Sequence, residues 1–247
     1  MQLYTVRDQL EQNLEGTLEQ ISGIGYNYLE AAGYRDGMLY NQKPKEFARI
    51  LKNLNMELKS SHVSVSDENI DEVIEAHAEA GCEYIVLPYL AQSERNEIDD
   101  YKKLAEKLNR LGAKTAKDGI RLGYHNHDFE FELMGGERGF DVLMKETDPE
   151  MLCFEIDFFW VLYAGINPME YLENHPGRFE LWHVKDMNNS DDKDFTEVGN
   201  GIINFETIFE AAEKSGMKYF FVEQDMCKKP PMESIQISYD NLLKMNL

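Results

Sequence analysis

The chain has 247 residues, of which 43% are apolar, so it is long enough to bury a substantial hydrophobic core. Its formal net charge is −21, from 46 acidic and 25 basic residues, which disfavours nucleic acid as a partner because a phosphate backbone would be repelled. No apolar run reaches the roughly 18 residues that a membrane helix needs, so no membrane partner is expected.

Short apolar runs alternate with amphipathic segments along the whole chain. We interpret the runs as strands, and the segments whose apolar residues recur every three or four positions as helices. The expected strands are 3–7, 26–32, 57–63, 84–88, 120–131, 151–157, 180–186 and 219–225. The expected helices are 13–24, 44–54, 68–81, 99–117, 140–147, 168–174, 205–215 and 234–245.

This order predicts a (β/α)8 TIM barrel that forms a single domain over 1–247. Each strand and helix pair averages roughly 30 residues, the size of a βα unit, and no linker or low-complexity tract divides the chain. In such a barrel the carboxyl ends of the strands meet at one mouth, where sites form. The polar, glycine-containing segment 187–200 is expected to be a loop at that mouth.

Ionisable side chains gather at the expected strand ends. Residues two apart in a strand share a face, so His125 and His127 are expected to point the same way. The same spacing recurs in Glu155 with Asp157, His183 with Lys185, and Glu223 with Asp225. One such pair alone would indicate an ordinary ion pair. Pairs at four successive strand ends favour a bound divalent cation, because buried charges are costly unless they are partnered.

One donor from each of these strand ends gives a candidate metal site. Its predicted ligands are His125, Asp157, His183 and Glu223. Imidazoles mixed with carboxylates suit Mn²⁺, Zn²⁺, Co²⁺ or Mg²⁺, and the residue types alone do not select among these ions. His127 is an alternative to His125, or an addition to it. A metal there would polarise a sugar carbonyl or hydroxyl.

Other residues at the mouth are candidates for proton transfer and for substrate binding. The predicted proton-transfer residues are Glu155, Lys185 and Glu223. The predicted substrate-binding residues are Tyr4, Glu30, His62, His127 and Trp160. For Tyr4 and Trp160 the expected contact is stacking on the apolar face of a sugar, and ordinary packing is the alternative.

Six motifs, in this order and spacing, resemble the sugar phosphate isomerase/epimerase family of xylose-isomerase-like barrels, over nearly the whole chain. They are QLYTVRD at 2–8, YHNHDFEF at 124–131, EIDFFW at 155–160, HVKD at 183–186, VGNG at 198–201 and VEQD at 222–225. The resemblance implies a small-molecule carbohydrate substrate. It also implies a divalent metal at the ends of strands five to eight, which here carry His125, Asp157, His183 and Glu223.

Two positions depart from the family pattern. Many relatives have Glu on strand five as one of two bases that shuttle a proton between the faces of the sugar, whereas this chain has His125. Many also have His three residues after the strand-six Asp, where this chain has Trp160. The two-glutamate epimerase mechanism therefore does not transfer intact.

We expect a metal-dependent isomerase or epimerase that abstracts a proton next to the carbonyl of a sugar or sugar derivative. One alternative is a metal-assisted lyase or dehydratase on a keto-sugar or polyol, using His125, His127 or Lys185. Another is a catalytically silent sugar-binding barrel. DNA-repair endonucleases share this fold, but the negative charge of the chain disfavours that activity.

Three widely spaced cysteines, Cys82, Cys153 and Cys227, leave one unpaired in any disulfide scheme, which favours a reducing cytoplasmic location. The N-terminus lacks the shape of a signal peptide. It begins next to the first expected strand, which leaves room for an N-terminal segment absent from this chain. Homo-oligomer formation is compatible with the sequence.

Overall fold

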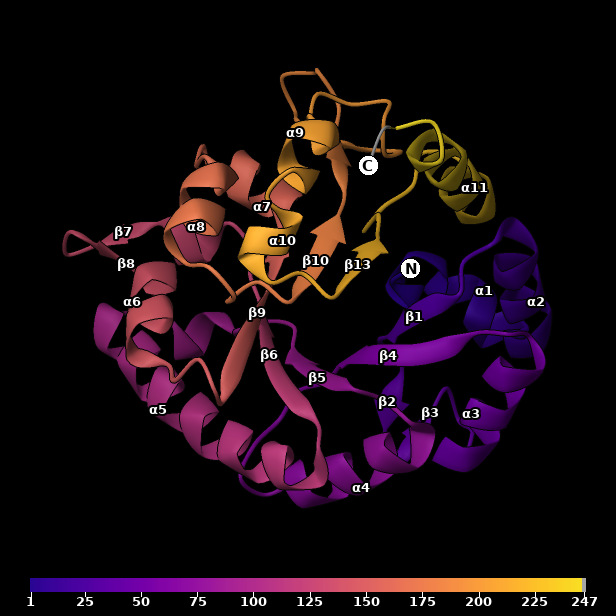
Figure 1. Cartoon of the computed structure of the whole chain (residues 1–247), viewed down its shortest axis with the longest axis horizontal. Helices are drawn as coiled ribbons and strands as arrows, with labels where there is room; N and C mark the ends of the chain where they lie inside the picture. The colour runs from indigo at the N-terminus through magenta and orange to yellow at the C-terminus, as the bar shows by residue number, and fades with distance from the viewer. Residues whose placement is uncertain (246–247) are drawn as a thin grey trace.

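The computed structural model describes residues 1–245, and over that range the main sheet has seven parallel strands that form a nearly closed barrel (Figure 1). The strands pair in the order β1-β4-β5-β6-β9-β10-β13. Their bounds are Tyr28–Ala31 for β1, Glu57–His62 for β4, Tyr84–Leu87 for β5, Arg121–His125 for β6, Leu152–Asp157 for β9, Leu181–Val184 for β10 and Tyr219–Val222 for β13. The expected TIM barrel is confirmed.

Helices surround the barrel and bury their apolar faces against it (Figure 1). The α-helices are α1 Arg7–Gln12, α2 Leu14–Ile24, α3 Pro44–Asn53, α4 Ile70–Ala80, α5 Ile98–Thr115, α6 Gly139–Glu146, α7 Phe158–Tyr163, α8 Pro168–Asn174, α9 Phe205–Phe209, α10 Ala212–Ser215 and α11 Pro231–Leu242. Short 3-10 helices are η1 Leu3–Val6, η2 Gln92–Glu94, η3 Ala116–Asp118 and η4 Phe129–Phe131. Within residues 1–245 no helix is long and apolar enough to cross a membrane.

The first expected strand, 3–7, is wrong, because this segment forms η1 and the start of α1. Gln2 ends the extended backbone, since its side-chain oxygen accepts a hydrogen bond from a backbone N–H of η1 at 3.0 Å. The eighth place in the barrel is filled instead by a parallel bridge between Gln2 and Glu30. The backbone N–H of Gln2 also donates to the Val222 carbonyl at 3.0 Å. The N-terminus therefore lies between β13 and β1 (Figure 1).

The expected strand 120–131 is shorter than predicted, because β6 ends at His125 and η4 follows. Side chains replace the strand partners at this point. Asn126 Oδ1 accepts a hydrogen bond from the Asp157 N–H at 3.0 Å, and Glu130 Oε2 accepts one from the His127 N–H at 2.8 Å. His127 is therefore outside the strand, although its ring centroid still lies 4.9 Å from that of His125.

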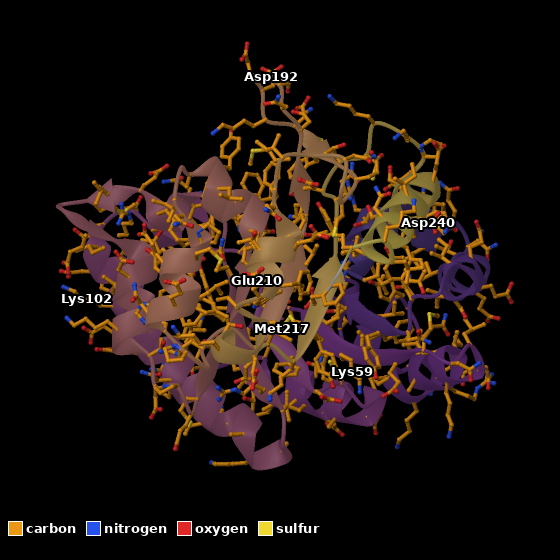
Figure 2. The ribbon with its side chains drawn as sticks, turned by 45° about the horizontal axis from the view of Figure 1, so that its top comes forward. Lys59, Lys102, Asp192, Glu210, Met217 and Asp240 are labelled. Atoms are coloured by element: carbon orange, nitrogen blue, oxygen red, sulfur yellow. The ribbon has the colours of Figure 1, made fainter. Side chains whose placement is uncertain are left out.

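Short antiparallel strand pairs lie outside the main sheet. They are β2 (Tyr34–Arg35) with β3 (Met38–Leu39), β7 (Leu133–Met134) with β8 (Glu137–Arg138), and β11 (Asp186–Met187) with β12 (Phe195–Thr196). The last pair arises within the segment expected to be a loop, and Asp192 lies at its outer tip (Figure 2). The helix expected at 205–215 is divided into α9 and α10.

Candidate active site

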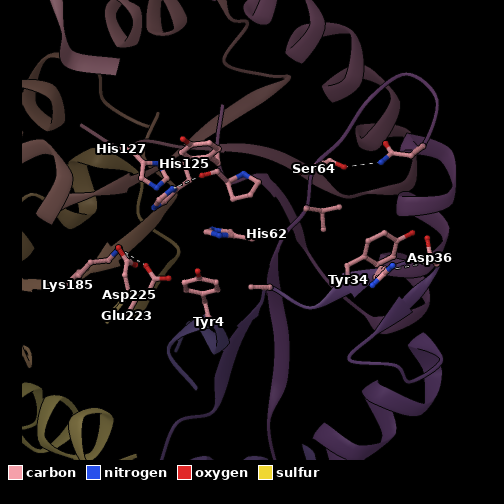
Figure 3. Close-up of a pocket in the computed structure, with 16 residues that line it drawn as sticks. Tyr4, Tyr34, Asp36, His62, Ser64, His125, His127, Lys185, Glu223 and Asp225 are labelled. Atoms are coloured by element: carbon pink, nitrogen blue, oxygen red, sulfur yellow. Dashed lines mark hydrogen bonds and ion pairs between the residues drawn. The ribbon is translucent and has the colours of Figure 1, made fainter. Parts of the chain in front are cut away.

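A pocket of about 700 Å³ opens at the carboxyl ends of the barrel strands (Figure 3). His62 and His125 from the ends of β4 and β6, and Lys185 and Glu223 from just after β10 and β13, form its inner wall. The other lining residues are Tyr4, Ala32, Tyr34, Arg35, Asp36, Val63, Ser64, Asn69, Pro88, Tyr89, His127 and Asp225. The pocket thus joins imidazoles, carboxylates and an ammonium to aromatic side chains.

The four predicted metal ligands converge beside this pocket, and we call them the upper group. Its members, all buried, are His125, Asp157, His183 and Glu223, and one ligand atom of each lies within 4.8 Å of all the others. They come from the neighbouring strands β6, β9 and β10 and from the residue after β13. The structure therefore brings these residues together, and their binding of a metal remains a prediction.

The ring of His125 is oriented for ligation. Its Nδ1 lies 3.2 Å from the Pro88 carbonyl oxygen, and its Nε2 lies 3.2 Å from Asp157 Oδ2. When Nδ1–H donates to the carbonyl, Nε2 presents its lone pair to the upper group. Neutral imidazole in that tautomer is a good donor for a divalent cation.

A second set of donors lies deeper in the barrel, and we call it the deep group. It consists of Glu30 of β1, His62 of β4, Glu155 of β9 and His183, with one ligand atom of each within 4.8 Å of all the others. His183 Nε2 lies 2.6 Å from Glu30 Oε1. The other nitrogen of the ring, Nδ1, lies 2.9 Å from Glu223 Oε2 of the upper group. The imidazole of His183 therefore connects the two groups.

Lys185 lies against carboxylates of the upper group. Its Nζ is 2.9 Å from Asp157 Oδ2, 2.7 Å from Glu223 Oε2 and 2.8 Å from Asp225 Oδ1. Burial alone would lower the pKa of Lys185, but these carboxylates raise it well above its ordinary value. Burial would likewise raise the pKa of Asp157, and the ammonium of Lys185 instead holds it well below its usual range. Lys185 is therefore protonated where it lies in the wall of the pocket.

The deep group packs two carboxyl groups against two imidazoles inside the barrel. Burial and the charge of Glu30 raise the pKa of Glu155 well above its ordinary value. Burial would also raise the pKa of Glu30, but His62 and His183 lower it to about 2. For His183, burial would lower the pKa, yet Glu155 and its neighbouring carboxylates raise it well above the usual range. These shifts keep a proton on Glu155 and a positive charge on His183, beside the ionised Glu30.

The predicted substrate-binding residues divide into two sets. Tyr4, His62 and His127 line the pocket, where Tyr4 is 42% exposed. Burial and the nearby His125 lower the pKa of His127 to about 2, so its ring is neutral. Trp160 lies behind the wall, with its ring centroid 5.4 Å from that of His127. Its position fits packing against a lining residue better than stacking on a sugar.

Glu30 and Glu155 do not border the pocket in the part of the chain that the structure describes. Both are completely buried. His62 lines the pocket, and its Nε2 lies 2.6 Å from Glu155 Oε2, so its ring connects the pocket with Glu155. The substrate contact of Glu30 and the proton transfer by Glu155 stay predictions, and the structure places both residues behind the lining of the pocket.

Some pocket residues were missed from the sequence. Asp225 lines the pocket and pairs with Lys185, and its two-residue spacing from Glu223 was the available signal. Tyr34 and Asp36 reach the pocket from the β2–β3 hairpin. The dipeptide Asp36-Gly37 is typical of a two-residue hairpin turn, and both residues have positive φ, 50° and 74°.

Asp186 explains why two of the sequence motifs occur together. Its buried carboxylate accepts hydrogen bonds from the backbone N–H groups of Met187, Gly199, Gly201 and Ile203, at 2.8 to 3.2 Å. A Cβ on Gly201 would lie 2.2 Å from Asp186 Oδ1, so the close approach needs glycine. The HVKD and VGNG motifs therefore form a clamp that fixes the loop after β10 beside Lys185.

Residues 18–244 match the family model described as Xylose isomerase-like TIM barrel. The chain belongs to this family. The chain is similar to a sugar phosphate isomerase/epimerase from Parabacteroides distasonis ATCC 8503, whose crystal structure superposes on it with a TM-score of 0.85. The two sequences are 30% identical. The match covers 98% of this chain and 92% of that one. The inosose dehydratase of Bacillus cereus strain AH820 is 24% identical over 274 residues, which span 93% of this chain and 90% of that protein.

The xylose isomerase-like fold also relates the chain to a crystal structure of the IOLI protein with a bound zinc atom. The two share 16% identity with a TM-score of 0.75, over 99% of this chain and 96% of that one. At this identity the likeness shows the fold alone.

Proposed function

We propose that the protein is a metal-assisted dehydratase that removes water next to the carbonyl of an unphosphorylated keto-polyol, such as an inosose or an oxidised sugar. The observation that carries the proposal is the Lys185 ammonium, held between Asp225 and Glu223 at the wall of the pocket beside two imidazoles. Elimination next to a carbonyl needs a base for the α-proton, a proton for the departing hydroxyl and stabilisation of the negative oxygen.

The upper group fits a divalent cation, because it combines imidazole and carboxylate donors and because the Pro88 carbonyl orients His125 for ligation. His125, Asp157, His183 and Glu223 would hold the ion. When bound, it would supply Lewis-acid polarisation of the substrate carbonyl.

Asp225 is the best placed base of this chain. Burial and the charge of Glu223 raise its pKa, whereas Lys185 and His183 hold the pKa of Glu223 well below the ordinary value. A carboxylate of higher pKa takes a proton more readily, so Asp225 accepts the α-proton. Its side chain is 24% exposed and borders the pocket, so a substrate can reach it.

Lys185 completes the acid–base pair. Its ammonium donates a proton to the departing hydroxyl, which leaves as water, and Asp225 then returns the α-proton to the amine across their 2.8 Å contact. Both residues regain their starting protonation states. The neutral ring of His127 borders the same pocket and positions a substrate hydroxyl by hydrogen bonding.

The pocket favours a substrate without phosphate. Among its described lining residues, the lysine and arginine side chains are Lys185, which pairs with carboxylates, and Arg35, which lies 3.4 Å from Asp36 and is 87% exposed. Arginine and lysine usually bind phosphate groups through charge-assisted hydrogen bonds, and both of these side chains are already paired with carboxylates. Aromatic rings such as Tyr89, 50% exposed, suit the apolar face of a polyol instead.

Two observations favour dehydration over the isomerisation first expected from the sequence. The inosose dehydratase relative aligns over 93% of the chain. His125 also stands where a two-base epimerase mechanism would need Glu. An isomerase or epimerase remains the second candidate, favoured by the 30% identity to the Parabacteroides distasonis protein.

Deuterium exchange tests these alternatives. The protein loaded with Mn²⁺ is incubated in D₂O with inosose and with a panel of keto-sugars, and the products are followed by mass spectrometry and by the absorbance of an unsaturated ketone. A dehydrated product supports the proposal. A deuterated product of unchanged formula would show an isomerase or epimerase, and binding without either product would show a silent barrel. Asp225→Asn should abolish dehydration, whereas Asp194→Asn, at an exposed ion pair with Lys228, should not.

A further inference from the structure

We infer that Arg7 and Arg95 are positioning residues that fix two tyrosine rings of the pocket, Tyr4 and Tyr89, against the ring of a cyclic substrate. The substrate class rests on the proposed function, and the two tyrosines narrow it from keto-polyols in general to cyclic ones. Neither arginine is among the described residues that line the pocket, so each acts through the ring that it contacts.

Tyr4 and Tyr89 border the pocket from different sides of the barrel mouth. Tyr4 follows Gln2, which fills the eighth place between β13 and β1, and Tyr89 follows β5. In the sheet order, β1 and β4 separate these two places on one side, and four strands separate them on the other. Tyr4 is 42% exposed and Tyr89 is 50% exposed. A ligand in the pocket can therefore contact both rings.

Arg95 holds Tyr89 through three contacts. Its Nε donates to the Leu90 carbonyl at 3.0 Å, and its Nη2 lies 3.4 Å from Tyr89 Oη. Its Cζ lies 3.5 Å from the ring centroid of Phe129, and that ring packs edge-on against Tyr89, with the centroids 5.5 Å apart. One guanidinium therefore fixes the backbone beside Tyr89, its hydroxyl and the ring behind it.

The contacts of Arg95 also reach His127, a second lining residue. The rings of Phe129 and His127 are parallel to within 6°, with their centroids 5.5 Å apart. Tyr89 packs edge-on against His127, with the centroids 5.3 Å apart. Loss of the guanidinium would therefore release two neighbouring parts of the pocket wall at once.

Arg7 holds Tyr4 in a similar way. Its Cζ lies 4.1 Å from the ring centroid of Tyr4, and its Nη1 donates to the Tyr4 carbonyl at 2.8 Å. The same nitrogen donates to the Asp225 carbonyl at 3.2 Å, which ties the start of α1 to the segment after β13. The cation on the ring face and the hydrogen bonds to the backbone together restrict the movement of Tyr4.

Neither guanidinium is engaged in an ion pair within residues 1–245. Both donate to carbonyl or hydroxyl oxygens and lie against aromatic rings. In a chain with 46 acidic residues, an arginine that served only the surface charge is expected to pair with a carboxylate. The arginines that form ion pairs in this range are Arg35, Arg49, Arg110, Arg121 and Arg138.

Two fixed aromatic rings favour a cyclic substrate over an open-chain one. A cyclic polyol presents a rigid face of C–H groups that an aromatic ring can cover, whereas an open chain must first be ordered. Exposed tyrosines would also lose conformational freedom when a ligand binds, and the arginines remove that loss because they hold the rings beforehand. Arg7 and Arg95 therefore contribute to affinity without touching the substrate.

Binding of two unreactive polyols tests the inference. The protein loaded with Mn²⁺ is titrated in a calorimeter with myo-inositol, which is cyclic, and with sorbitol, which is an open chain. We expect the wild type to bind myo-inositol about tenfold more tightly than sorbitol. Arg95→Met and Arg7→Met should each weaken myo-inositol binding by about tenfold and leave sorbitol binding nearly unchanged. Arg110→Met, which removes an exposed partner of Asp67, should behave as the wild type.

Kinetics with inosose distinguish positioning from a general loss of structure. Arg95→Met should raise KM by about tenfold and change kcat by less than about twofold, because the contacts of a fixed ring are the same in the ground state and the transition state. Circular dichroism shows whether each variant is folded. Arg95→Lys and Arg7→Lys keep the charge without the flat guanidinium, so they should show the same loss and replace a variant that unfolds.

The outcomes separate this inference from the proposed function. The inference is overturned if the wild type does not prefer myo-inositol, or if the folded Arg95 and Arg7 variants bind it as tightly as the wild type. A fall in kcat equal to the rise in KM would also overturn it. Polyol binding that follows the expected pattern, in a protein that does not dehydrate inosose, would support the positioning role and refute the proposed reaction.

Discussion

Lys185 Nζ lies 2.7 Å from Glu223 Oε2, and the two side chains are only 1% and 5% exposed. The same oxygen lies 2.9 Å from His183 Nδ1, the nitrogen that belongs to the upper group. An ammonium and the proposed metal ion would therefore compete for one carboxylate. This competition gives the ion pair a measurable effect on metal binding.

Replacing Lys185 with Met should strengthen metal binding while it removes activity. Asp157 and Glu223 lose a competing positive charge, so we expect Mn²⁺ to bind the upper group about tenfold more tightly, about 1.4 kcal/mol. The rate of dehydration should fall by about 100-fold or more because the proton donor is lost. Calorimetry and the absorbance assay measure the two effects. Weaker Mn²⁺ binding in Lys185→Met would contradict the competition.

Asn126→Ala should destabilise the barrel at the site. The completely buried Asn126 side chain accepts the Asp157 N–H at 3.0 Å, so its removal leaves a buried donor without a partner. We expect a loss of about 2 kcal/mol in the free energy of unfolding, measured with urea. Asn96→Ala removes an exposed asparagine and should change stability by less than about 0.5 kcal/mol. Equal effects of the two substitutions would show that the Asn126 hydrogen bond contributes little.

Glu130 should make stability depend on pH. Burial raises its pKa from 4.5 to about 7, so the folded protein holds this proton where the unfolded chain has released it. Above about pH 7 the Glu130 carboxyl group is ionised and buried, and it lowers the free energy of unfolding by its full amount. This destabilisation decreases as the pH falls toward 4.5 and the group takes up its proton. Wild-type stability relative to Glu130→Gln should therefore rise by about 2 kcal/mol from about pH 8 to about pH 5. Urea unfolding at each pH measures it, and a difference that stays constant with pH refutes the assignment.

Asp186→Ala should loosen the loop after β10. The substitution removes the acceptor for backbone N–H groups that include those of Gly199 and Gly201, at 2.9 and 3.0 Å. We expect a loss of about 3 kcal/mol in unfolding free energy, together with faster amide hydrogen exchange over 187–203. The same exchange rates in both proteins would show that the carboxylate does not hold the loop.

Repeating local patterns made much of the fold predictable. Apolar runs followed by ionisable pairs located the barrel strands and brought the upper group together, because carboxyl ends of parallel strands share one edge. The segment 3–7 was wrongly predicted to be a strand, because the Gln2 side chain caps η1. Only the bridge between Gln2 and Glu30 joins this segment to the sheet. Spacing in sequence likewise could not place Glu30 and Glu155 below the pocket, because depth depends on the relative register of separate strands.

The arrangement around Asp186 also shows where this barrel tolerates change. The backbone N–H of Asn188 donates to the Asp194 carbonyl at 2.9 Å, which closes the outer tip of the β11–β12 pair above the clamped glycines. Residues 189–193 lie beyond that closure, and Asp192 projects outward from the barrel (Figure 2). Foreign peptides, such as an epitope or a metal-affinity sequence, can therefore be grafted at 189–193 while the chemistry at Lys185 is retained.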